Sequence, residues 1–106
     1  MADQQPVTRE WIAGHVANEV SRLPEPVLRR WEAYAVEPWV GHLNHRPGAS
    51  HKQVYVVAER GREVLYWDDI ENQFARGTRV AAQWVDAVEL IGARLSWALQ
   101  KFHPAG

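Results

Sequence analysis

Apolar residues along residues 8–23 recur at the spacing of one face of an α-helix. Thr8 stands where an N-cap residue belongs and Pro24 ends the pattern, so we predict a helix over this range. Its apolar stripe consists of Trp11, Ile12, His15, Val16, Val20 and Leu23. A second helix is predicted over 26–36, because Pro26 is favoured at the first helical position and a Glu-Pro pair follows the range.

A β-hairpin is predicted in the stretch VYVVAERGREVLYW, which is rich in β-branched and aromatic residues on both sides of Gly61. With Gly61 in the turn, the strands cover 53–59 and 62–68. In the register that we expect, Tyr55 faces Tyr66.

Both faces of this hairpin are apolar. Side chains alternate along a strand, so one face carries Val54, Val56, Ala58, Leu65 and Trp67. The other face carries Tyr55, Val57, Val64 and Tyr66. A hairpin solvated on one side is normally polar there. The second face is therefore either covered by a helix or is a contact surface for a partner.

The C-terminal third fits a helical period of 100° per residue, which predicts a long helix over 79–102. Its core stripe would be Val80, Trp84, Val88, Ile91, Leu95, Ala98, Leu99 and Phe102. Leu90 and Trp97 would lie on the opposite side, flanked by Arg94. Either another segment of the chain covers them or they contact a partner. The predicted fold is α+β, with a small antiparallel sheet packed against three helices.

The composition indicates the general class of protein but does not indicate its function. The length predicts a single domain, residues 1–106, and 46% hydrophobic with 24% charged residues is typical of soluble globular domains. The net charge of −1 gives no overall attraction for nucleic acid or anionic membranes. There is no Cys, which excludes disulfides and thiolate chemistry. No apolar run approaches about 18 residues, so we expect a cytoplasmic protein without a membrane partner.

Three carboxylates, Asp68, Asp69 and Glu71, follow the second hairpin strand. Asp69 is a good N-cap for a helical turn through IENQF, with Glu71 in its first turn. This accounts for the residue types without any chemistry. The same carboxylates are also candidates for facing a basic partner surface.

Histidines are the only candidates for a metal site. A candidate edge strand over 39–45 contains His42 and His45, and His51 follows a Pro-Gly turn. With carboxylates such as Asp68 they could complete a metal shell, but their spacing matches no established zinc motif. We therefore predict no cofactor and keep these histidines as weak metal candidates.

Catalytic motifs are missing from the chain. It has neither a G-x-S-x-G nucleophile motif nor a Gly-rich phosphate loop, and the adjacent Ser50 and His51 do not make a triad. The sequence favours a non-enzymatic role, although acid–base chemistry by the carboxylates stays open.

The hairpin pattern VVAERGREVLYWDDIENQF resembles one found in small uncharacterised bacterial proteins. The resemblance covers about 20 residues and implies a bacterial origin and a shared fold. It carries no assigned activity.

The leading hypothesis is a bacterial protein-interaction domain, a homodimer or the binder of a protein partner, such as an immunity or antitoxin-type inhibitor or an adaptor. Its predicted contact residues are Tyr55, Tyr66, Leu90, Arg94, Trp97, Asp68, Asp69 and Glu71. The alternative is a small-molecule or metal-binding protein that uses His42, His45 and the carboxylates of 68–71.

Overall fold

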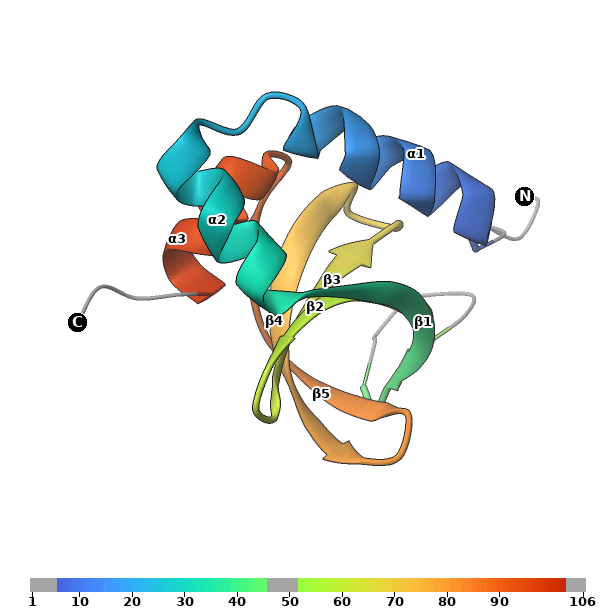
Figure 1. Cartoon of the computed structure of the whole chain (residues 1–106). Coiled ribbons are helices and arrows are strands. Elements are labelled where there is room, and N and C mark those ends of the chain that lie inside the picture. The colour runs from blue at the N-terminus through green and yellow to red at the C-terminus, as the bar shows by residue number, and fades with distance from the viewer. Residues whose placement is uncertain (1–5, 46–51, 103–106) are drawn as a thin grey trace.

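The computed structural model describes residues 6–45 and 52–102, which form an α+β fold of five strands and three helices (Figure 1). The helices gather on one side of a small barrel, and the tip of the β4–β5 hairpin points away from them. The elements are α1 (Arg9–Val20), α2 (Glu25–Tyr34), β1 (Ala35–Leu43), β2 (Gln53–Arg60), β3 (Glu63–Asp68), β4 (Gln73–Ala81), β5 (Trp84–Gly92) and α3 (Leu95–Phe102). No helix in the described ranges is long and apolar enough to cross a membrane.

The first two predicted helices are confirmed. Thr8 caps α1, because its Oγ accepts the backbone N–H of Trp11 at 3.0 Å. Pro26 lies in the first turn of α2, where a missing N–H costs nothing. The chain leaves α2 at Ala35 with extended backbone angles and passes directly into β1.

The five strands follow one another around the barrel in chain order, and each neighbouring pair is antiparallel. In an up-and-down arrangement of five strands the first and last run in the same direction, so β1 and β5 close the barrel as a parallel pair. That closure, which we call the seam, consists of His42 opposite Trp84 and Leu43 opposite Val85. The strand predicted over 39–45 is β1, but it is not an edge strand where it meets β5.

The long helix predicted over 79–102 is wrong. The structure has β4 and β5 joined by the two-residue loop Ala82–Gln83, and only α3 is helical. No glycine marks this loop; Ala82 itself adopts a φ of 45°. The apolar positions of this segment fit a helical period by coincidence. The hairpin is formed by pairing between strands, which the spacing of apolar residues does not reveal.

The register predicted for the first hairpin is also wrong. Gly61 and Arg62 form the loop, and Gly61 has a φ of 61°, as the first loop position of a type II′ turn requires. The loop lies one residue later than predicted, which moves each partner by two positions, and a bulge between Val56 and Ala58 takes one of these back, so Tyr55 lies opposite Trp67 rather than Tyr66.

Both faces of the β2–β3 hairpin are apolar because each faces a different hydrophobic core. One core lies between the sheet and the helices and includes Tyr55, Val57, Leu65, Trp67 and Phe74 with residues of α1, α2 and α3. The second fills the barrel with Leu43, Val54, Val56, Val64, Tyr66, Ala75 and Val85. Tyr55 and Tyr66 are therefore buried in separate cores, so of the two alternatives for this hairpin, coverage by the chain itself is the one observed.

Candidate functional site

The carboxylates after β3 organise a turn, but the capping residue differs from the prediction. Asp68 is buried, and its Oδ1 accepts the backbone N–H groups of Ile70 and Glu71, both at 3.0 Å. Asp69 does not cap a helical turn; its Oδ2 accepts the N–H of Val7 at 3.2 Å and so fastens the segment before α1. The residues after the turn continue as β4, not as helix.

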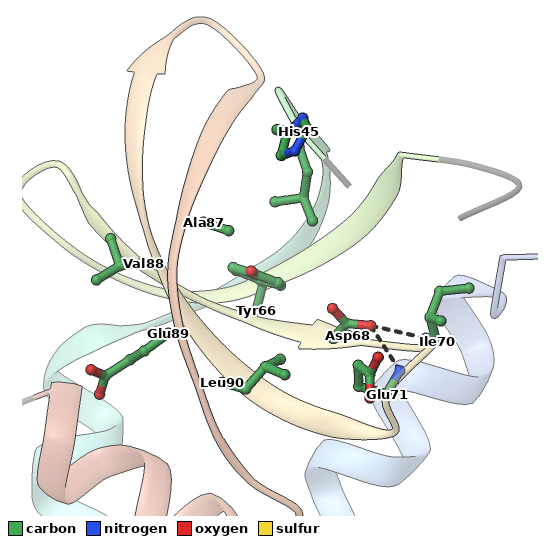
Figure 2. A pocket seen from close by; sticks show the side chains of 10 residues that line it. His45, Tyr66, Asp68, Ile70, Glu71, Ala87, Val88, Glu89 and Leu90 are labelled. Carbon is green, nitrogen blue, oxygen red and sulfur yellow. Dashed lines mark hydrogen bonds between the residues drawn. The ribbon is translucent and has the colours of Figure 1, made fainter. Parts of the chain in front are cut away.

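This turn closes one end of a groove of about 320 Å³ beside β5. Figure 2 shows Tyr66, Asp68 and Leu90 on one side of β5, and Val88 and Glu89 on the other. We call this groove the seam groove, because it opens beyond the two residue pairs that join β1 to β5. It is lined by Leu43 and His45 at the end of β1, Tyr66 and Asp68 of β3, Ile70 and Glu71 of the turn, and Ala87, Val88, Glu89 and Leu90 of β5.

The contribution of β5 shows how the groove is oriented. Side chains alternate between the two faces of a strand, yet four consecutive residues, 87–90, line the same groove. The register with β4 shifts between Arg76 and Gly77, so β5 is bulged at Val88, and this breaks the alternation. The last backbone bond across the seam is from Asn44 N–H to Val85 O at 3.0 Å, and beyond it no described residue pairs with β5 on that side.

The same strand carries unusually exposed apolar side chains. Val85 is its one buried residue, while Val88 and Leu90 are 51% and 47% exposed. Monomeric proteins normally leave few large apolar side chains together on the surface. Val88 and Leu90 are the two most exposed large apolar side chains of β5.

Carboxylates give the seam groove an acidic character. Glu71 is exposed and makes no ion pair with any described residue. Glu89 lies 3.5 Å from Arg76, whose pKa is raised first by a hydrogen bond to Glu63 and further by Glu89 itself. Arg76 thus compensates the negative charge of Glu89, whereas no described cation compensates that of Glu71.

The two histidine candidates that the structure describes, His42 and His45, occupy different places. His45 lines the seam groove with Asp68 and Glu71, but His42 lies in the seam with its ring 5.6 Å from that of Trp84. Among residues 6–45 and 52–102, no three His, Asp or Glu side chains come together as a metal site. His51 lies outside the described residues.

Leu90, Arg94 and Trp97 do not form the single helical stripe that was predicted. Leu90 belongs to β5, whereas Trp97 extends from α3 and is 54% exposed. Trp97 packs over Gly92, where an added Cβ would lie 2.8 Å from its ring. Arg94 instead pairs with the buried Glu19 of α1 at 2.9 Å and so holds α3 against α1.

Of the β5 residues that line the groove, the sequence pattern points to Leu90 but not to Ala87, and it places Val88 in a helical core stripe. Leu43 of β1 also carries no sign of this role in the sequence. The signal that favours a strand is the frequency of valine at positions 80, 85 and 88, since β-branched residues are enriched in strands.

A separate aromatic cluster lies between α1 and the sheet. The ring of His15 stacks on Trp11 at 4.9 Å and lies 4.4 Å from Trp67, between an exposed and a buried tryptophan. Burial lowers the pKa of His15; the charge of Glu19 opposes this effect, and that of Arg94 adds to it. No described group pairs with the buried Nε2 of His15 or Nε1 of Trp67.

In comparisons with known proteins, no protein-family model, curated protein or solved structure matches this chain. The resemblance of its hairpin to small bacterial proteins stays a prediction. Functional inference therefore rests on the geometry of the chain itself.

Proposed function

We propose that this domain is a non-enzymatic protein-interaction module whose partner, another protein or a second copy, binds at the seam groove. The observation that carries the proposal is the exposed pair Val88 and Leu90 beside a groove of about 320 Å³. Complete burial of such a side chain stabilises by about 1.5–3 kcal/mol, so covering these half-exposed residues contributes roughly 1 kcal/mol each.

The charge of the groove supports one class of partner. Glu71 is exposed and makes no ion pair with any described residue, which favours a partner surface that carries Lys or Arg beside apolar residues. An immunity or antitoxin-type inhibitor that binds a basic effector has this chemistry, as does an adaptor for a basic segment. The contact residues in this proposal are Leu90, Asp68 and Glu71 from the sequence prediction, with Val88 added.

The test compares two matched surface variants. The double variant Val88→Asp with Leu90→Asp places charge in the apolar surface, while Val80→Asp alters an equally exposed valine of the same hairpin outside the groove lining. We expect the double variant to lose self-association in sedimentation velocity, or to lose the proteins retained by the tagged wild-type chain. The Val80→Asp control should keep them.

The proposal fails if all three proteins sediment as monomers and retain the same set of proteins. Urea unfolding of each variant ensures that a loss of binding is not a loss of folding.

A small-molecule ligand is the second candidate. The volume falls within the range of ligand pockets, and His45, Asp68 and Glu71 supply polar groups along an apolar lining. A thermal-shift screen with small organic amines tests it, with Leu90→Asp as the variant that should remove any stabilisation.

A further inference from the structure

The exposed edge of β5 gives the seam groove a specific way to hold a partner. The barrel is closed by only two residue pairs, and beyond Val85 no described residue pairs with this edge. An extended segment placed there would meet the backbone N–H and C=O groups of residues 86–90, a stretch of β5 that is bulged at Val88.

We infer that the seam groove takes an extended segment of the partner protein, which pairs with residues 86–90 of β5 as an additional strand. This inference rests on the proposed function and specifies the partner: a strand with alternating apolar and basic residues. Main-chain hydrogen bonds supply affinity in this mode of recognition, and alternate side chains supply specificity.

The apolar residues expected in the partner strand follow from the side chains that line the groove. Side chains of an added strand point alternately toward the barrel and away from it. Those pointing inward would meet the exposed Leu90, beside the buried Leu43 and Tyr66, which also line the groove. Valine, isoleucine or leucine suits these positions.

The basic residues expected in the partner strand follow from the carboxylates at the groove and at the strand edge. Glu71 lies at the turn end of the groove and Glu89 on β5, with the exposed Asp86 next to the seam. Asp86 accepts a hydrogen bond from Asn44 at 2.5 Å, which keeps its charge beside the β5 edge. Lysine or arginine on the partner strand would pair with these groups.

Charge also argues against a second copy of the chain as the added strand. If two β5 strands paired about a two-fold axis, both copies would bring Asp86 and Glu89 to the same short ladder. Like charges across a ladder are destabilising. A partner of opposite charge is therefore favoured over self-pairing at this edge.

The experiment uses the full chain and three synthetic heptapeptides with blocked ends. The first alternates lysine and valine, the second replaces each lysine with glutamate, and the third is the lysine peptide with alternate backbone nitrogens methylated. Binding is followed by backbone amide shifts in NMR titrations. We expect the lysine peptide to shift residues 86–90 in a saturable way, the glutamate peptide to bind at least tenfold more weakly, and the methylated peptide not to bind.

Two charge-reversal variants complete the test. Glu71→Lys should weaken binding of the lysine peptide several-fold, whereas Glu32→Lys, an exposed residue of α2, should leave it unchanged. Equal binding of the methylated peptide overturns strand addition but leaves the proposed interaction at the groove intact. Equal binding of the glutamate peptide, or the absence of shifts in β5 with the lysine peptide, overturns the inferred partner chemistry.

Discussion

Single residues explain why a strand rich in β-branched and aromatic residues ends in carboxylates. Asp68 accepts two backbone N–H groups of the following turn, and Asp69 holds the segment before α1. Hydrogen bonds to a charged acceptor contribute about 1.5–3 kcal/mol each, so the residue types are explained by the turn itself. The same turn places the exposed Glu71 at the seam groove.

His15 gives a prediction at this scale. Burial, which is the largest effect, lowers its pKa from the ordinary value of 6.5, so the folded protein binds this proton less readily than the unfolded chain. Below about pH 6.5 the unfolded state binds more protons, and the free energy of unfolding should fall as the pH decreases toward the folded pKa. Above about pH 6.5 the contribution of His15 to stability is fully present.

Urea unfolding of the wild type and of His15→Phe at about pH 7.5 and about pH 5.5 measures this effect. The phenylalanine keeps an aromatic ring against Trp11 and Trp67 but cannot be protonated. The wild type should lose more stability than the variant on acidification. The same loss in both proteins would contradict a lowered pKa.

At the scale of elements, the β4–β5 hairpin forms one wall of the barrel. β4 and β5 approach each other closely at Gly77 because this residue has no side chain. A Cβ at Gly77 would lie 2.7 Å from Cγ1 of Val85 and 2.8 Å from the backbone oxygen of Asp86. Real Cβ atoms do not approach backbone this closely, so the pair of strands depends on the missing side chain.

Two glycine substitutions of the same type should therefore have opposite effects. Gly77→Ala should destabilise by about 1–3 kcal/mol, because the new methyl group forces β4 and β5 apart. Gly14→Ala in α1, where no atom lies within 4 Å of the added Cβ, should stabilise by about 0.5–1 kcal/mol. Chemical denaturation measures both, and a neutral Gly77→Ala would show that the hairpin adapts.

At the scale of the whole molecule, the barrel is closed unevenly. β2 and β3 have a neighbouring strand on each side, whereas β5 meets β1 through two residue pairs only. Few buried contacts and exposed backbone groups are features of regions that open at low free energy.

Hydrogen exchange should reveal this difference. In the free protein, amides of residues 86–90 should exchange faster on average than those of 54–58 and 64–67. Addition of the lysine–valine peptide should slow the β5 amides and leave the others unchanged. Equal protection of β5 in the free protein would mean that its edge is already covered.

The sequence by itself determined α1, α2 and the presence of the first hairpin, because caps, prolines and a turn glycine act on neighbouring residues. It also placed Leu90 and Trp97 outside the core stripe, and both are exposed, although Leu90 lies on a strand and not on the predicted helix. Local signals of this kind specify an element before any tertiary contact forms.

Only the tertiary structure decided β4, β5 and the seam groove. Eight of the nine side chains of β5 are not fully buried, so the strand shows no alternation of buried and exposed residues that a sequence could display. Its pairing with β4 and β1 depends on where distant residues meet, as Leu43 and Val85 do. The groove exists because that meeting ends after two pairs, which is a property of barrel geometry and not of any local run of residues.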